Sequence, residues 1–265
     1  MTKRMVVAME LQDDRVRLYN GDCIEKMKQL APKSIDLIIT DPPYNLGNFM
    51  RDRQTNLLKM RKNFFGAAGW DDLDFLDWVE HMNQFFEQAH RILKDRGAMI
   101  IFMSLIRVET LVELASKHKF YYKTTGIWHK LNPMPRNMNL HFINSVEGWI
   151  YFINNGKTGT FNNQNKAIHD FIETGATPAS EKKYGSHPTQ KPEILYSHFI
   201  DILSNKDEVV LDPFMGSGTA GVVCKQLARK FIGIEFNEQY FINASNRINA
   251  TMEQKVVTDI KETRR

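Results

Sequence analysis

The sequence predicts an α/β fold, in which a doubly wound, mostly parallel sheet carries helices on both faces. Short apolar runs typical of buried strands alternate along the chain with segments whose apolar residues recur at helical spacing. In addition, two of the strand-like runs, IDLIIT (35–40) and EVVL (208–211), are followed directly by aspartate and proline. Proline lacks a backbone N–H and fixes φ, so each strand is expected to end there. Ligands of such folds bind outside the carboxyl ends of the strands, and we expect both endings to line one edge.

The first part of the chain supplies alternating strands and helices. Strands are expected over 15–22, 35–40, 97–104, 121–130 and 147–154, and helices over 23–30, 74–97 and 108–117. The longest of these helices follows from apolar residues that recur at helical spacing between Phe75 and Ala89, and it is expected to end near Gly97. The strands over 121–130 and 147–154 are expected to form an antiparallel pair, with Trp128, Trp149 and Phe142 in the core.

The second part of the chain begins with a polar zone, 154–186, that is rich in Asn, Gly and Thr and is expected to be a loop-rich insertion. A helix started by proline is expected within 187–203. It is followed by a strand over 208–214, a helix over 218–229 and a strand over 230–237. Each strand of this part is therefore separated from the next by a helix, as a parallel sheet requires.

Composition limits the class of protein. The chain has 265 residues and a formal net charge of +4, which permits a polyanionic partner without demanding one. Its two cysteines argue against a disulfide framework, and no zinc-type ligand spacing predicts a metal site. The N-terminal apolar run is too short for a signal peptide, and no apolar stretch approaches the ~20 residues of a membrane span. We therefore expect a cytoplasmic protein without a membrane partner.

A glycine loop, 216–221 (GSGTAG), follows one strand and opens a helix. Its glycines let the backbone approach a ligand, the helix N-terminus favours an anionic group, and Glu235 at the end of the next strand can accept from ribose hydroxyls. Any adenosine-bearing cofactor fits this description, including NAD and S-adenosylmethionine. Asp212 precedes the loop and would repel a pyrophosphate, whereas it could accept from the α-ammonium of a methionine. This favours S-adenosylmethionine.

The sequence Asp41-Pro42-Pro43-Tyr44 places a carboxylate, a stiff turn and an aromatic ring at a strand end. By itself it could be a simple turn. If the substrate is an exocyclic amine of a nucleobase, the Asp41 carboxylate and the Pro42 carbonyl could accept its two protons and aim the nitrogen lone pair at a methyl group. Tyr44 could then stack on the base. A base inside a duplex cannot reach such a site, so the target would have to be flipped out.

These motifs resemble those of the DNA amino-methyltransferases. The matching stretches are TDPPYNLG (40–47), HPTQKPEIL (187–195), VVLDPFMGSGTAGVV (209–223) and FIGIEFNEQY (231–240). The order, with the catalytic motif before the cofactor loop, resembles the β class of that family. The resemblance covers about 16–248 and implies one methyltransferase domain over 1–265, with a seven-stranded, Rossmann-like sheet that contains one antiparallel strand.

The resemblance also implies roles for individual residues. The catalytic residues would be Asp41, Pro42, Pro43 and Tyr44. The residues binding S-adenosylmethionine, and the product S-adenosylhomocysteine, would be Asp22, Cys23, Asp41, Lys191, Asp212, Phe214, Gly216, Ser217, Gly218, Thr219, Glu235 and Phe236. Most of these lie in a cofactor-binding portion, 187–248, and His187 and Thr189 resemble the segment that closes the pocket. Cys23 could equally be a small buried residue.

DNA contacts are expected from basic loops. After the catalytic motif, 45–70 is expected to be a mobile basic loop, and 154–186 would be a short target-recognition insertion that shares DNA contacts with 129–139. The candidate phosphate ligands are Arg51, Arg53, Arg61, Lys62 and Arg136.

The activity that the resemblance implies is site-specific methylation of adenine N6 in DNA, since Asp before Pro-Pro-Tyr is usual for adenine enzymes. N4-cytosine methylation is the alternative within the family. A dinucleotide-dependent oxidoreductase and a non-catalytic DNA-binding protein are alternatives of other classes. DNA is thus the expected partner, and a homodimer and a cognate restriction endonuclease are possible further partners.

Overall fold

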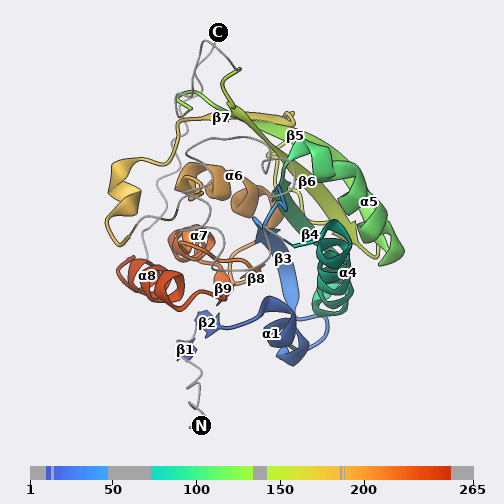
Figure 1. Cartoon of the computed structure of the whole chain (residues 1–265), viewed down its shortest axis with the longest axis horizontal. Coiled ribbons are helices and arrows are strands. Elements are labelled where there is room, and N and C mark those ends of the chain that lie inside the picture. Colours follow the sequence, from blue (N-terminus) through green and yellow to red (C-terminus); the bar gives the residue numbers. More distant parts are fainter. Residues whose placement is uncertain are drawn as a thin grey trace.

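A mixed sheet forms the centre of the protein, with the strand order β1-β2-β9-β8-β3-β4-β6-β5-β7 (Figure 1). The computed structural model describes residues 10–12, 15–46, 73–133, 142–185, 187 and 189–251. The strands within these residues are β1 (Glu10–Gln12), β2 (Val16–Asn20), β3 (Ile35–Thr40), β4 (Leu93–Met103), β5 (Phe120–Lys130), β6 (Val146–Asn154), β7 (Phe171–Thr174), β8 (Val209–Asp212) and β9 (Lys230–Glu235).

The strand directions confirm the doubly wound, mostly parallel sheet. β2, β9, β8, β3 and β4 run parallel to one another, whereas β6 is antiparallel to both β4 and β5. The seven neighbouring strands β2-β9-β8-β3-β4-β6-β5 thus form the expected sheet, and β6 is its antiparallel strand. Two short edge strands that were not predicted extend it: β1 pairs antiparallel with β2, and β7 pairs parallel with β5.

Helices cover both faces of the sheet (Figure 1). One layer consists of α1 (Cys23–Gln29), α4 (Phe75–Ile92) and α5 (Val108–Lys117). The opposite layer consists of α6 (Glu193–Leu203), α7 (Thr219–Gln226) and α8 (Glu238–Asn249), of which α8 was not predicted. Short 3-10 helices, η2 (Leu105–Arg107) and η3 (Ala179–Lys182), occur in two connections.

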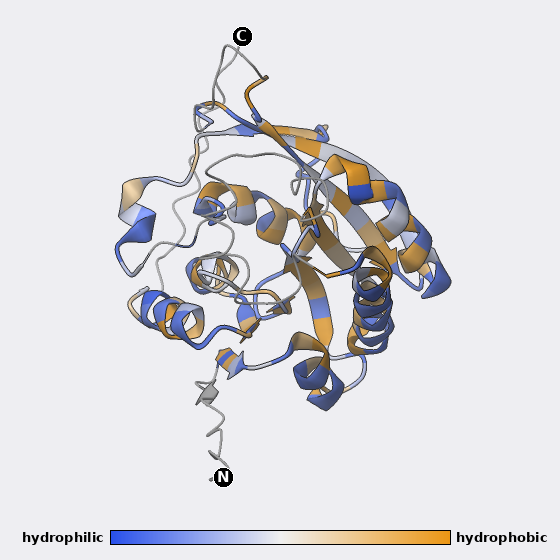
Figure 2. Cartoon of the chain, in the orientation of Figure 1, coloured by the Kyte–Doolittle hydropathy of each residue, from blue (hydrophilic) through white to orange (hydrophobic). Residues whose placement is uncertain are grey.

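The three consecutive apolar residues 37–39 of β3 are explained by this two-sided burial. Leu37 and Ile39 pack in the core under α6 and α7, whereas Ile38 packs in the core under α1 and α4. Successive side chains of a strand point to opposite faces, so neighbouring residues are all apolar where the strand is covered on both sides. Figure 2 shows the same distribution, with apolar residues along the sheet and polar residues on the outer faces of the helices.

Two expectations about local structure were wrong, those for the end of the long helix and for Phe142. The long helix ends at Ile92 rather than near Gly97, because the chain already pairs with β3 at Leu93, opposite Ile35. The zone 154–186 is mostly loop in its described residues, as its composition indicates, and β7 and η3 are its short regular elements. Phe142 is fully exposed instead of buried, although Trp128 and Trp149 do lie in the core. No helix of the described part of the chain is long and apolar enough to cross a membrane.

Candidate active site

The two strand endings that carry Asp-Pro lie side by side. β3 and β8 are neighbouring parallel strands with Ile38 opposite Leu211, so the residues that follow them emerge at the same edge of the sheet. A buried hydrogen bond joins the two endings, since the Thr40 hydroxyl donates to Asp212 Oδ1 at 2.9 Å. The turn at Asp41 and the loop that begins at Asp212 therefore form one continuous site.

The turn after β3 is fixed by residues of α4 and η2. The indole Nε1 of Trp78 donates to the Pro43 carbonyl at 3.1 Å, and Arg107 donates to the Asn45 carbonyl at 2.9 Å. Asn45 is buried and has a φ of 47°, a left-handed conformation that asparagine tolerates better than most residues. The Arg107 guanidinium also lies 4.5 Å from the centre of the Phe75 ring. These contacts hold the turn in one conformation.

The Asp41 carboxylate has a donor on each oxygen. The Tyr44 hydroxyl donates to Oδ1 at 2.6 Å, and the Lys191 ammonium forms an ion pair with Oδ2. Lys191 is almost completely buried, which is unusual for lysine unless it is paired. The structure thus brings together two of the predicted regions, the turn at 41–44 and the segment around 191, which are about 150 residues apart in the chain.

A second carboxylate, that of Glu147 on β6, lies beside this pair. Its Oε2 accepts from the Tyr44 hydroxyl at 3.2 Å and lies 3.3 Å from the Lys191 Nζ. Its Oε1 is bound by the Lys130 ammonium from β5. Sequence reasoning missed Glu147 and Lys130. The available signal was that Glu147 stands at the start of an otherwise apolar strand, where an acid needs a partner.

Burial and charge set the protonation of this cluster. Burial raises the pKa of Asp41, Lys191 opposes that rise, and the neighbouring Glu147 carboxylate adds to it. Burial also acts to raise the pKa of Glu147, but the ammonium groups of Lys191 and Lys130 outweigh it and lower the pKa to about 2. Glu147 is therefore the more persistent anion, and Asp41 is the better proton acceptor of the two.

The glycine loop has the backbone that its sequence implies. Gly216 and Gly218 have φ values of 52° and 76°, and Gly218 is the N-cap of α7. Glu235 at the end of β9 is held by two backbone amides, of Gly216 to Oε2 and of Asn237 to Oε1, each at 2.8 Å. Each oxygen of an ionised carboxylate keeps a further lone pair, so Glu235 can still accept from two hydroxyl groups.

Asp212 differs from Glu235 in being fully enclosed. Its Oδ1 accepts from the Phe214 amide at 3.1 Å as well as from Thr40, and burial raises its pKa to about 7. Such a carboxyl group ionises more readily when a cation binds beside it. Nearby, the Phe214 ring packs 6.0 Å from Phe85, whereas Phe236 is 55% exposed.

The residues after β2 adjoin Glu235, because the Gly21 amide donates to the Glu235 carbonyl at 3.0 Å. Asp22 uses its carboxylate to cap α1, accepting from the Glu25 amide at 3.0 Å. Cys23 is buried, and burial raises the pKa of its thiol well above the ordinary value. Cys23 is thus an unreactive packing residue next to the site.

The segment that leads to α6 closes against the glycine loop. The Thr219 hydroxyl donates to the Lys191 carbonyl at 3.2 Å, and a Cβ on Gly216 would lie 3.4 Å from the His187 ring. That ring packs edge-on against Tyr240, with 4.5 Å between the ring centres. Burial lowers the pKa of His187 to about 4, so the imidazole is neutral at physiological pH.

Arg247 of α8 connects the loop to this segment. Its guanidinium donates to the Ser217 carbonyl at 3.2 Å, to the Thr219 hydroxyl at 3.0 Å and to Glu193 Oε1 at 2.7 Å, and it lies 3.6 Å from Glu181 Oε2. Nothing in the sequence pattern indicates this role, because an arginine on an amphipathic helix is usually solvated.

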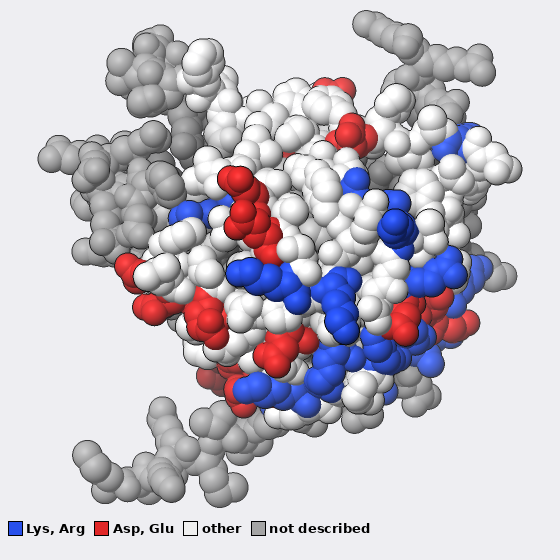
Figure 3. All heavy atoms as spheres, turned by 90° about the vertical axis from the view of Figure 1, so that its right-hand side faces the viewer, with Lys and Arg blue, Asp and Glu red and all other residues white. Residues whose placement is uncertain are grey.

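The five cations proposed to contact phosphates, namely Arg51, Arg53, Arg61, Lys62 and Arg136, lie outside the described residues. Figure 3 views the molecule from the side of α4 and α5 and shows Lys and Arg side chains gathered along one edge, with Asp and Glu among them. Lys123 and Lys157 are exposed near the amino-terminal edge of the sheet, where both lie within 6 Å of the Tyr121 ring centre. They are therefore remote from the site at the carboxyl edge.

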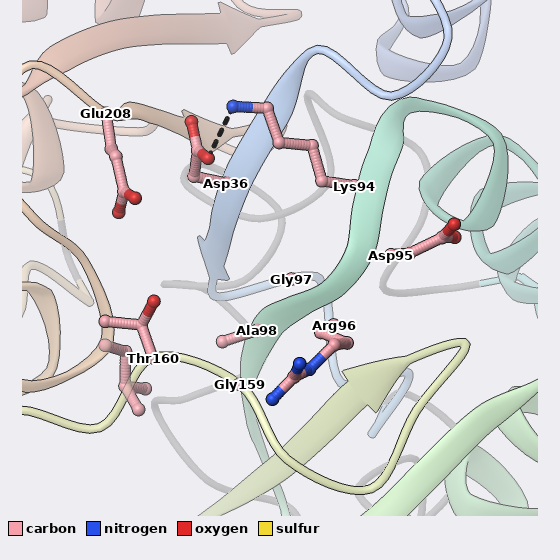
Figure 4. Close-up of a pocket in the computed structure, with 10 residues that line it drawn as sticks. Asp36, Lys94, Asp95, Arg96, Gly97, Ala98, Gly159, Thr160 and Glu208 are labelled. Atoms are coloured by element: carbon pink, nitrogen blue, oxygen red, sulfur yellow. Dashed lines mark hydrogen bonds and ion pairs between the residues drawn. The ribbon is translucent and has the colours of Figure 1, made fainter.

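A cavity of about 320 Å³ also lies at the amino-terminal edge of the sheet, where Asp36, Lys94 and Glu208 are among its lining residues (Figure 4). Two of its charged residues already form an ion pair with each other. Lys94 pairs with Asp36 Oδ1 at 2.6 Å, and Asp36 Oδ2 accepts from the Val209 amide at 2.9 Å. This cavity is open and polar, and it is separate from the residues described above.

Comparison with known proteins identifies a family. Residues 35–246 match the family described as DNA methylase. The chain is 32% identical over 246 residues to the type II methyltransferase M.HinfI of Haemophilus influenzae, a match that covers 87% of this chain and 67% of that protein. It is 29% identical over 260 residues to the DNA adenine methyltransferase YhdJ of Escherichia coli K12, with coverage of 88% and 82%.

Solved structures show the same fold. The M1.HpyAVI–SAM complex superposes with a TM-score of 0.64 at 28% identity, covering 88% of this chain and all of that one. The cytosine-N4-specific PvuII DNA methyltransferase superposes with a TM-score of 0.71, covering 89% and 87%, but at 18% identity this likeness shows the fold alone.

Proposed function

This chain belongs to the DNA methylase family, and we propose that it transfers a methyl group from S-adenosylmethionine to the exocyclic N6 of adenine in DNA. The family makes it a DNA amino-methyltransferase, acting on N6 of adenine or N4 of cytosine. The observation that carries the proposal is the hydrogen bond from Thr40 to Asp212, which joins the turn at Asp41 to the start of the glycine loop. An amine held by the turn at Asp41 would face a methyl donor held by the glycine loop.

The residues at the carboxyl edge fit S-adenosylmethionine. Glu235 is oriented by two amides and keeps lone pairs for the ribose hydroxyls, and Asp212 can accept from the α-ammonium group. The backbone of Gly216 and Gly218 at the N-terminus of α7 suits the carboxylate. We assign Phe236, Asp22 and Cys23 to the adenine end. When bound, the cofactor supplies an electrophilic methyl group and leaves as S-adenosylhomocysteine.

The chain's own contribution to the chemistry is to hold the acceptor amine. We assign the two amine protons to the Asp41 carboxylate and the Pro42 carbonyl, which directs the nitrogen lone pair away from the ring of the base. The nitrogen becomes cationic as it takes the methyl group, and it then loses one proton. Asp41 is suited to accept that proton because burial raises its pKa. Tyr44 would stack on the flipped base.

Adenine is favoured over cytosine by the relatives. The curated protein YhdJ, 29% identical to this chain, is named a DNA adenine methyltransferase, whereas the cytosine-N4-specific PvuII enzyme shares only 18% identity. The contacts to DNA are assigned to 45–70, 129–139 and 154–186. The first two segments follow β3 and the end of β5 in the chain, whereas 154–186 starts at the amino-terminal edge and reaches the carboxyl edge only at the end of β7. On this assignment, residues 1–265 act as one methyltransferase domain with 187–248 as its cofactor-binding portion.

Nucleoside analysis tests the proposal. The purified protein is incubated with methyl-labelled S-adenosylmethionine and unmethylated duplex DNA, and the product is digested to nucleosides and separated. We expect label in N6-methyl-2′-deoxyadenosine. Label in N4-methyl-2′-deoxycytidine would overturn the assignment to adenine. Absence of label from both, with duplex and with single-stranded DNA, would overturn the proposal.

A further inference from the structure

Two donors at the site are shared between two carboxylates. The Lys191 ammonium pairs with Asp41 Oδ2 and lies 3.3 Å from Glu147 Oε2, and the Tyr44 hydroxyl lies 2.6 Å from Asp41 Oδ1 and 3.2 Å from the same Glu147 oxygen. In both cases the contact to Asp41 is the shorter one. A small movement of either donor would nevertheless transfer its hydrogen bond from Asp41 to Glu147.

This arrangement conflicts with the role of Asp41 as a proton acceptor. Each oxygen of its carboxylate has a donor but keeps a lone pair for an amine hydrogen. The positive charge of Lys191, however, lowers the pKa of Asp41 and so makes its carboxylate a weaker proton acceptor. To take a proton from the amine, Asp41 must therefore be released from Lys191. Lys191 is buried, and a buried ammonium that loses its counter-charge is strongly destabilised. Its release therefore requires a second anion within reach.

Glu147 meets the requirements for that anion. Its pKa is held at about 2 by Lys191 and Lys130, against the effect of burial, so it stays ionised throughout the physiological range. Lys130 on β5 binds its other oxygen, and the register places Glu147 opposite Trp128 on that strand. Glu147 is thus fixed in position by the sheet while Oε2 faces Lys191 and Tyr44.

We propose that Glu147 is a positioning residue, which receives the Lys191 ammonium and the Tyr44 hydroxyl when Asp41 accepts the target amine. The inference rests on the proposed function. It assigns to a glutamate outside the recognised motifs the task of freeing the Asp41 carboxylate. The Lys191 charge stays neutralised throughout, because one carboxylate replaces the other as its partner.

Charge and shape can be separated at this position. Glu147→Gln keeps the shape and removes the charge, whereas Glu147→Asp keeps the charge and shortens the side chain. A residue that only fills space would tolerate Gln better than Asp. If Glu147 acts as the counter-charge, the order is reversed. The measurement is the single-turnover rate of DNA methylation with enzyme in excess, together with the dissociation constants for DNA and S-adenosylhomocysteine.

We expect Glu147→Gln to lower the single-turnover rate by at least about tenfold, a typical effect of losing one charge-dependent contact at a reaction centre. Glu147→Asp should stay within about threefold of the wild-type rate. The dissociation constant for DNA should change by less than about threefold, because phosphate contacts dominate DNA affinity. The constant for S-adenosylhomocysteine should change equally little, because Glu147 is not among the residues assigned to the cofactor. Asp95→Asn is the matched control, since it removes an exposed carboxylate that pairs with Lys33 at the opposite edge, and its rate should equal that of the wild type.

A wild-type rate for Glu147→Gln would overturn the inference, as would an equal loss in the Gln and Asp variants. If the Gln variant does not fold, Glu147→Asp and Glu147→Asn make the same comparison of charge at equal length, with the Asp variant expected to be the faster. A wild-type protein that methylates no DNA would instead contradict the proposed function, so the two failures are distinguishable.

Discussion

The Thr40 hydroxyl donates a 2.9 Å hydrogen bond to Asp212 Oδ1, and both residues are buried. This contact spans two adjacent strands at the point where each strand ends. It therefore sets the position of the proposed amine-binding turn relative to the proposed cofactor loop. A reaction between two bound groups depends on such alignment, because small displacements of the reacting atoms reduce the rate strongly.

Thr40→Val should damage both stability and catalysis. Valine has the shape of threonine but cannot donate, and the variant leaves a buried carboxyl oxygen with only the Phe214 amide as donor. We expect a loss of about 1–3 kcal/mol in the free energy of unfolding, measured with urea, and a lower single-turnover rate. Thr158→Val, at an exposed threonine of the opposite edge, should change stability by less than about 0.5 kcal/mol. Equal effects of the two substitutions would contradict this account.

Asp212→Asn should change how stability depends on pH. Burial raises the pKa of Asp212 to about 7, above its value in the unfolded chain, so the folded protein binds the extra proton between about pH 4 and 7. Stability contributed by this group is therefore lost as the pH rises through that window. The variant should gain stability relative to the wild type as pH rises, by on the order of 4 kcal/mol at pH 8 if the whole shift is recovered.

The measured quantity is the unfolding free energy of Asp212→Asn minus that of the wild type. It is compared at pH 4 and at pH 8, because the contributions of other titrating groups cancel in this difference. A difference that does not change with pH would show that Asp212 titrates normally.

The variant should also bind S-adenosylmethionine more weakly than the wild type, by isothermal titration calorimetry, because it lacks the anion assigned to the α-ammonium group.

Gly218→Ala should destabilise the N-terminus of α7. Gly218 has a φ of 76°, and a Cβ there would lie 3.0 Å from side-chain atoms of both Ala244 and Ile248 in α8. Backbone strain of about 1–2 kcal/mol is expected in addition to the steric cost. Thermal unfolding and cofactor titration measure the result. An alanine at this position with unchanged melting temperature and affinity would contradict the left-handed conformation.

Arg247→Met should loosen the glycine loop. The substitution leaves Glu193 without its 2.7 Å partner and removes the donors to Ser217 and Thr219. Breaking a fully buried ion pair costs about 3–5 kcal/mol, and this half-buried pair should cost less. Arg229→Met is a matched control, since Arg229 is equally buried but binds Ser204 and Asp201 away from the loop. Both variants should be less stable, and only Arg247→Met should lose affinity for S-adenosylhomocysteine. Equal affinities in the two variants would contradict a link between Arg247 and the cofactor loop.

The parts of the fold that are determined locally were predictable. The run at 35–40, the glycines at 216 and 218 and the helical spacing after Asp74 each depend on neighbouring residues, and the structure follows them. The joining of Asp41 and Asp212 at one edge was also predictable, because parallel strands place their carboxyl ends together.

The partners of these groups were not predictable, because they depend on contacts between distant segments. Glu147 and Arg247 resemble ordinary charged residues in the sequence, and only the packing of β6 and α8 brings them to Lys191 and Ser217. Phe142 shows the opposite error, since an apolar residue near a strand was expected in the core and is fully exposed. Apolar character favours burial but does not require it.

Substitution of Asp41 by alanine tests the central claim most directly. The experiment measures, for Asp41→Ala and the wild type side by side, the amount of N6-methyladenine formed in DNA and the dissociation constant for S-adenosylhomocysteine. We predict that methylation falls by more than about 100-fold, since the acceptor for the amine protons is lost. Cofactor affinity should survive, because Glu235, Asp212 and the glycine loop, to which the proposed function assigns the cofactor, stay in place. An Asp41→Ala protein that methylates adenine at a rate near that of the wild type would contradict the account.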